Sequence, residues 1–233
     1  MPWKAFFSPR HRISQISNQE AFEALRGAFC KWGCPKCLRV DNGQPLASTE
    51  PSATSALALC LIAYGIAVHT NRPGVPQENG KVERQQGTSM RWAEVKRCRT
   101  LREAQDKVNE AVVIQREQYP VSRLKGQTRL QAFPQLLEKQ RPWQEATFDE
   151  QRVYDFLAQK QFMRKVSTCG QITHFMHKPQ IAAAYKGQTV CLKFNAFTLK
   201  WEVYAANGDF IKSLKADYLC ADRIKNMTVY SKN

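Results

Sequence analysis

Two carboxylates, Asp41 and Glu83, stand out as candidates for metal chemistry. Asp41 follows a short apolar run in LRVDNG, and Glu83 lies early in a polar segment in PQENGKVER. A carboxylate at a strand end and another on a neighbouring helix can converge on Mg²⁺ or Mn²⁺, because these hard cations prefer oxygen ligands. Two such ions can activate an attacking oxygen and stabilise a leaving oxygen in phosphoryl transfer. Asp-Asn-Gly is also a common turn sequence, and a lone Asp in it is more often structural, so the pair alone is weak evidence for a metal site.

The elements that would position these carboxylates follow from apolar periodicity. The first 140 residues predict a strand at 12–17, a helix at 19–32 capped by Asn18, a strand at 37–40, a helix at 52–64, a strand at 66–69, a loop at 71–79 and helices at 80–97 and 101–118. Asp41 therefore ends one predicted strand, and Glu83 lies in the first turns of a predicted helix.

The second half of the chain has a different pattern. Short alternating runs predict strands at 188–194, 200–204 and 210–214, and Asn207-Gly208 between the last two predicts a hairpin. In this alternation Trp201 faces the interior. We expect a domain at 1–140, a linker or helix at 141–165 and an all-β domain at 166–233.

The net charge indicates a polyanionic partner. The 233 residues include 35 Lys and Arg against 20 Asp and Glu, a formal net charge of +15 at pH 7. Residues 1–140 carry 21 basic and 12 acidic residues, a net of +9, and residues 141–233 carry 14 and 8, a net of +6. An excess of this size is most often found in proteins that bind nucleic acid, although a well-solvated basic surface is the alternative. We expect both halves to contact the same polyanion.

Other classes of protein find little support. No long apolar segment follows Met1, and the eight Cys are therefore expected to be reduced in the cytoplasm. The most apolar stretch, at 53–68, is 16 residues long and broken by polar residues, so we expect no membrane contact. The sequence has no G-x-S-x-G, phosphate-binding loop or dinucleotide fingerprint.

The motifs LRVDNG and RPGVPQENGKVER, with 41 residues between Asp41 and Glu83, resemble motifs in the core domain of retroviral integrases and related insertion-sequence transposases. The resemblance covers roughly residues 12–135. It implies an RNase H-like α/β core in which Asp41 is the second catalytic Asp and Glu83 the catalytic Glu. Both would be ligands of Mg²⁺ or Mn²⁺. It also implies transposon ends and target DNA as partners, and a homo-oligomer in the intact family.

Residues from about 166 onward are similar to the small SH3-like barrel that follows this core in several bacterial transposases. AYKGQTV and WEV carry this likeness. The fold class that we expect is therefore an RNase H-like integrase core lacking its first strands, followed by an SH3-like all-β barrel that acts as a C-terminal DNA-binding domain.

The third carboxylate of the family is missing from its place. The family has an Asp on the opening strand of the sheet, but residues 1–40 contain no Asp, and their only acids are Glu20 and Glu23. We therefore expect a transposase or integrase fragment that binds DNA and does not catalyse strand transfer alone. Two alternatives stay open: a regulatory protein that occupies transposon ends, and an active transposase whose true start lies upstream.

Polar residues around the two carboxylates are the candidates for DNA contacts. They are Asn42, Asn79, Lys81, Arg84, Arg91, Lys96 and Arg97. Arg84 and Arg91 are seven residues apart, so they share one helix face. The resemblance implies that Lys81 and Arg84 approach phosphate beside the site, where such contacts set affinity and salt dependence. A solvated helix face is the alternative.

Cysteine and histidine spacing gives two weaker metal signals. Cys34-x-x-Cys37 with Cys30 could supply thiolates for zinc, but no second Cys pair or His pair completes a four-ligand set. His174 and His177 near Cys169 form a similar but still weaker pattern. In both places a structural role is the favoured interpretation.

Overall fold

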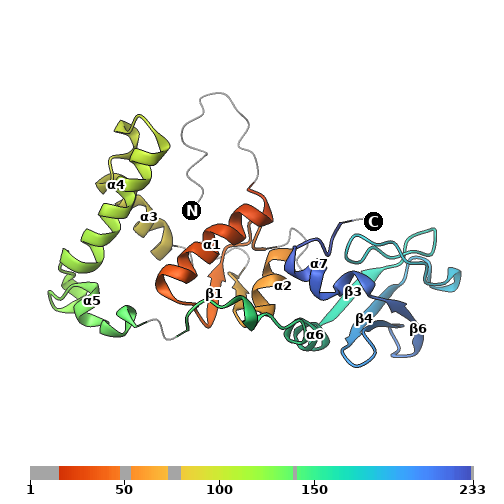
Figure 1. The fold of residues 1–233 in the computed structure, drawn as a ribbon. Helices are drawn as coiled ribbons and strands as arrows, with labels where there is room; N and C mark the ends of the chain where they lie inside the picture. Colours follow the sequence, from red (N-terminus) through yellow and green to blue (C-terminus); the bar gives the residue numbers. More distant parts are fainter. Residues whose placement is uncertain (1–15, 48–53, 73–79, 139–140, 232–233) are drawn as a thin grey trace. The chain divides into compact units, whose positions relative to one another are not determined.

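The computed structural model describes residues 16–47, 54–72, 80–138 and 141–231 (Figure 1). Most of the predicted strand at 12–17, together with Asn79, lies outside these residues. The chain forms two compact units: unit 1 comprises 1–35 and 71–143, and unit 2 comprises 36–70 and 144–233. Both are described separately below. The architecture is mixed α/β, with a parallel pair of strands and a separate antiparallel sheet, both in unit 2.

Unit 1 begins with helix α1 (Asn18–Trp32). Its N-cap is Ser17 and not Asn18, because Ser17 Oγ accepts a 3.2 Å hydrogen bond from the Glu20 N–H. In return, the Glu20 carboxylate accepts a 3.1 Å hydrogen bond from the Ser17 N–H. This reciprocal capping box satisfies two N–H groups that the first helical turn leaves without partners.

The apolar face of α1 packs on the last residue of unit 1. The rings of Phe22 and Phe29 are buried, and each lies 5.9 Å from the ring of Trp143. Burial of an aromatic side chain of this size stabilises a fold by about 1.5–3 kcal/mol. These contacts join the two sequence segments of unit 1.

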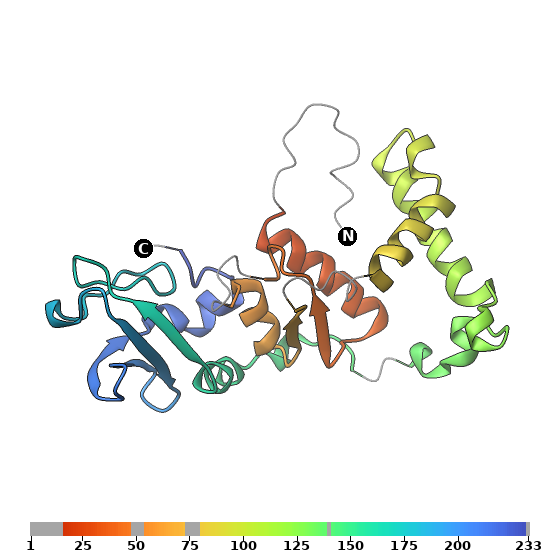
Figure 2. The same ribbon diagram turned by 180° about the vertical axis from the view of Figure 1, so that it is seen from behind.

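A helical hairpin forms the rest of unit 1. Its elements are α3 (Gly80–Trp92), η3 (Val95–Arg97), α4 (Leu101–Val113), the π-helical turn η4 (Ile114–Gln118), and then η5 (Ser122–Leu124), α5 (Arg129–Ala132) and η6 (Pro134–Leu137). The single helix expected at 80–97 is interrupted after Trp92, because Glu94 adopts a left-handed backbone with φ 45°. The chain then reverses, and α3 and α4 lie side by side (Figures 1 and 2). Small side chains fill the contact: Ala93, Val95, Cys98, Ala104, Val108 and Ala111.

Unit 2 opens with the parallel strands β1 (Cys37–Val40) and β2 (Ala67–Thr70), joined through α2 (Ala56–Ala63). Cys37 pairs with Ala67 and Val40 with Thr70. All eight residues of α2 are apolar and buried, which is typical of a helix enclosed by its neighbours. These neighbours are β2, α6 (Gln151–Ala158) and α7 (Ala221–Lys225).

The second sheet of unit 2 is antiparallel with strand order β3-β4-β5-β6. Its strands are β3 (Gln161–Lys165), β4 (Thr189–Asn195), β5 (Lys200–Tyr204) and β6 (Phe210–Lys215), with η8 (Ala183–Tyr185) before β4 and η9 (Asp217–Leu219) after β6. The predicted Asn207-Gly208 hairpin is confirmed, with Gly208 at φ 91°. The sheet is open in the described residues, since β3 and β6 are its two edges. The expectation of a closed barrel is therefore not met there.

Alternation along the strands builds the core of this sheet. Trp201 is buried, as its alternation with Val203 predicts. Helix α6 covers the sheet through Tyr154, whose ring lies 5.8 Å from that of Phe194. The short helix η7 (Glu145–Thr147), α6 and β3 all fall within the segment predicted as a linker or helix. The assignment of domains at 1–140 and 166–233 stays a prediction.

Among the described residues, no helix is both long and apolar enough to cross a bilayer.

Candidate metal and nucleic-acid site

Asp41 follows β1 directly and is exposed, as is Asn42. The backbone N–H of Gly43 donates a 3.2 Å hydrogen bond to Asp41 Oδ1, which closes a small turn and orients the carboxylate. A Cβ on residue 43 would lie 3.2 Å from the same oxygen, so the glycine gives the carboxylate room. The Asp-Asn-Gly segment thus forms the turn that its composition predicts, with an outward-facing carboxylate at a strand end.

Glu83 lies in the first turn of α3 and is exposed. An acidic side chain there is stabilised by the positive end of the helix dipole. Asp41 belongs to unit 2 and Glu83 to unit 1. Each carboxylate therefore has the local setting that the sequence predicts, at a strand end and at a helix start. Their convergence on one ion stays a prediction.

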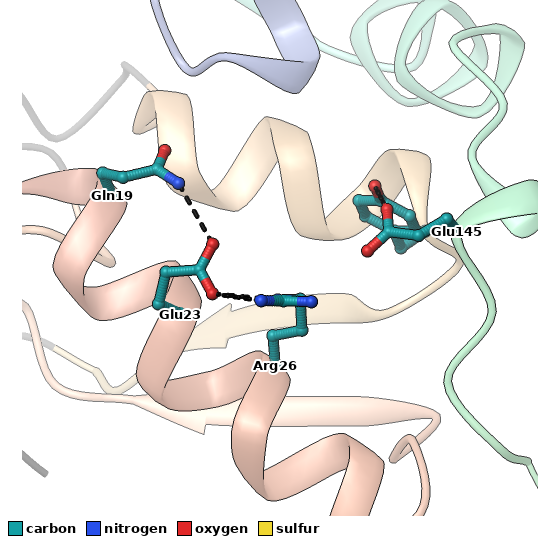
Figure 3. Close-up of polar contacts among 5 residues, drawn as sticks. Gln19, Glu23, Arg26 and Glu145 are labelled. Carbon is teal, nitrogen blue, oxygen red and sulfur yellow. Dashed lines mark hydrogen bonds and ion pairs between the residues drawn. The ribbon is translucent and has the colours of Figure 1, made fainter.

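The two acids of residues 1–40 are both engaged locally on α1. Glu20 completes the capping box with Ser17. Glu23 accepts hydrogen bonds from Arg26 at 2.9 and 2.6 Å and from Gln19 at 3.2 Å (Figure 3). These helix-surface pairs use both carboxylates within their own turns. Neither residue supplies a third carboxylate at a strand end.

No group of three or more His, Cys, Asp or Glu residues within the described ranges is arranged to hold a metal ion. Among the candidate thiols, burial raises the pKa of Cys34, which opposes the thiolate form that binds zinc.

The basic candidates of unit 1 form an exposed series along α3 and η3. Arg84 and Arg91 are exposed two turns apart on α3, and Lys96 and Arg97 follow on η3. Arg97 also forms a 3.1 Å ion pair with Glu94. Lys81 lies in the first turn of α3, while Asn79 precedes the described part of that helix. Arginine side chains presented along one helix face suit phosphate contacts.

The sequence did not predict two groups of residues that could take part in binding. In unit 1 the guanidinium of Arg116 lies 3.6 Å from the centre of the Trp32 ring, a cation–π contact between residues far apart in the sequence. In unit 2 several cationic and aromatic side chains line one pocket. These residues come from the segment before β4, from β5 and from β6 onward, so no local motif could have revealed the pocket.

No protein-family model matches the chain. The candidate residues are characterised by their local settings. Asp41 is an oriented carboxylate after β1 in unit 2, whereas Glu83 and the exposed arginines lie on α3 in unit 1.

Proposed function

We propose that the chain is an integrase-like transposase protein that binds DNA and does not cut it unaided. The observation that carries the proposal is the setting of the two carboxylates. Asp41 directly follows β1 in LRVDNG, and Glu83 lies in the first turn of α3 in PQENGKVER, the two motifs that resemble those around the second and third catalytic residues of the integrase-like family.

The finer fold assignment belongs to the same proposal. The succession β1, α2, β2 and α3 has the order expected for this portion of an RNase H-like core. The antiparallel strands β3 to β6 would then be an SH3-like module that adds DNA contacts. As in the family, we expect a homo-oligomer in the cytoplasm, acting on transposon ends and target DNA.

DNA binding is supported by the charge of the chain and by the surface of α3. The net charge of +15 favours association with a polyanion, and Arg84 and Arg91 are free to reach phosphate oxygens. The neighbouring carboxylate of Glu83 repels phosphate. We therefore expect the favourable phosphate contacts of α3 to be made by the two arginines. Contacts of this kind position DNA and do not read its sequence.

We expect no cleavage because the chain has too few carboxylates in the positions that the family uses. In the family, three carboxylates hold two ions that activate the attacking oxygen. Here Glu20 and Glu23 are engaged in helix-surface pairs. Two carboxylates provide too little charge and too few ligands to fix a pair of divalent ions.

The test is a gel assay with labelled duplex that carries the ends of the parent element, at low salt with Mn²⁺. Binding and nicking are scored in the same samples. We expect a shifted band without nicked product, and the same shift for Asp41→Asn and Glu83→Gln. Nicking that is lost in both variants would show a working enzyme with a third ligand. Absence of any shift at low salt would refute DNA binding.

A further inference from the structure

Unit 2 contains a pocket of about 680 Å³ beside the antiparallel sheet. Its aromatic lining comes from His174, His177, Trp201 and Tyr218. The rings of His177 and Tyr218 are stacked, with centres 4.3 Å apart and planes 22° apart. The volume lies in the range of small-molecule sites, which is roughly 300–1,000 Å³. The pocket therefore offers a flat aromatic wall to a ligand of moderate size.

Within the part of the chain that the structure describes, the buried imidazole of His174 has no hydrogen-bond partner. His174 is only 3% exposed, and neither of its ring nitrogens forms a hydrogen bond. Burial lowers the pKa of His174 to about 3, so the ring is neutral at pH 7. A neutral imidazole has one N–H donor and one acceptor nitrogen, both unused here. The two nitrogens point to different sides of the ring, so the polar edge of one ligand could satisfy one of them.

The histidines are held by a tight two-residue turn. His174 and His177 exchange two backbone hydrogen bonds of 3.0 Å, and the intervening Phe175 and Met176 have φ of 49° and 64°. Left-handed backbone is unfavourable for side chains of this kind, and such strain is concentrated at functional sites. The Phe175 ring stacks on Tyr230 at 5.0 Å, which anchors the turn.

Cations complete the lining. Lys178, Lys215 and Arg223 border the pocket, against a single carboxylate, Asp217. Arg223 donates a 2.7 Å hydrogen bond to the Ser231 carbonyl. The side-chain ammonium groups of Lys178 and Lys215 form neither an ion pair nor a hydrogen bond with any described residue, so their charges are available to an anion. The site therefore combines positive charge with aromatic surface.

We propose that this pocket binds a single unpaired nucleotide. The base would lie against the ring pair of His177 and Tyr218, with its polar edge toward His174, and the phosphate would lie near Lys178 and Lys215. A free mononucleotide and a nucleotide in a single strand present the same chemistry. The proposal goes beyond the function proposed above and does not depend on it, since a chain that ignores transposon ends can still bind a nucleotide.

The test is isothermal titration calorimetry of the full chain with deoxyadenosine 5′-monophosphate as the ligand. Inorganic phosphate and deoxyadenosine are titrated separately. The test variant is Lys178→Gln with Lys215→Gln, two exposed or partly exposed positions whose change should not unfold the sheet. Lys186→Gln is the matched control, because Lys186 is exposed in the same unit and does not border the pocket. We expect the double variant to weaken mononucleotide binding by about tenfold or more, and the control by less than about twofold.

Further arms define the ligand. Phosphate that binds as tightly as the mononucleotide would overturn the role of the base. Equal affinity in the wild type and the double variant, or no mononucleotide binding at millimolar concentration, would overturn the site. A short single-stranded oligonucleotide that displaces the mononucleotide, where the matching duplex does not, would identify the source as an unpaired strand. Failure of the strand to compete would identify the free nucleotide.

Discussion

The hydroxyl of Tyr64 donates a 2.7 Å hydrogen bond to Oε2 of Glu145, a residue 81 positions away. The Tyr64 ring also contacts Phe148 edge-on, with centres 5.4 Å apart. In addition, the Asp149 N–H donates to the Ala63 carbonyl at 3.1 Å. These contacts join the end of α2 to the chain as it re-enters unit 2, and so they connect the two sequence segments from which the unit is made.

Removal of the Tyr64 hydroxyl should weaken this connection. We expect Tyr64→Phe to lower the free energy of unfolding by about 0.5–1.5 kcal/mol, because the ring contacts remain and the exposed Glu145 can bind water instead. Urea unfolding followed by circular dichroism measures the change. Tyr185→Phe is the matched control, since no described hydrogen bond uses its hydroxyl. Equal effects of the two changes would argue against a structural role for the Tyr64 bond.

His174 should make unit 2 sensitive to acid. Its pKa is lowered from 6.5 to about 3, first by burial and then by the charges of Arg164 and His177. Above pH 6.5 the ring is neutral in both the folded and the unfolded chain. Between pH 6.5 and 3 the unfolded chain takes up a proton that the folded chain does not. Stability should therefore fall with decreasing pH, by up to about 1.4 kcal/mol per pH unit.

The measurement compares thermal unfolding of wild type and His174→Phe from pH 7 to pH 4. Phe is suited to the position because His174 lies edge-on to Phe162 and Trp201, with ring centres at 5.2 and 4.3 Å. We expect a shallower pH dependence in the variant, whatever its stability at neutral pH. Parallel curves for the two proteins would contradict the assignment of this proton uptake to His174.

Gln115 connects the π-turn η4 to α3 inside unit 1. Its side chain is only 2% exposed, it accepts a hydrogen bond from Gln85, and it donates one of 3.2 Å to Ser89 Oγ. We expect Gln115→Leu to cost about 1–3 kcal/mol, because it removes buried hydrogen bonds and leaves Ser89 without a donor. Hydrogen exchange of α4 amides reports the loss within unit 1. Gln118→Leu, exposed in the same turn, should change exchange little.

The sequence predicted the elements whose signals are local. β1, α2, β2 and the β5–β6 hairpin all lie where apolar patterns and the Asn-Gly turn indicate. The break after α3 escaped prediction because Glu94 adopts left-handed backbone without being Gly or Asn. The turn between His174 and His177 escaped for the same reason, since Phe175 and Met176 are not residues that turn rules select.

Among the candidate functional residues, too, the positions set by local sequence were predictable and those set by tertiary packing were not. The exposed positions of Asp41, Arg84 and Arg91 follow from their places at a strand end and along a polar helix. The pocket of unit 2 could not be predicted, because its lining joins residues from before β4 with Trp201 of β5 and with residues of β6 and beyond. Its chemistry depends on tertiary packing, and the spacing of His174 and His177 indicated only a weak metal signal.

If the chain binds DNA as proposed, the arginines of α3 should contribute to its affinity and salt dependence. Arg84 and Arg91 are exposed on α3, and each phosphate contact contributes about 0.9 to the slope of log K against log salt for duplex DNA. Arg84→Gln with Arg91→Gln should therefore reduce the slope by roughly 1.8 and weaken binding to all duplex sequences alike. Fluorescence anisotropy of a labelled duplex across a salt series gives both quantities. Arg26→Gln is the control, because that guanidinium pairs with Glu23 on α1 at 2.6 Å and lies outside the candidate series. An unchanged slope in the double variant would remove Arg84 and Arg91 from the DNA-binding surface and leave the other basic residues of the chain to account for any binding.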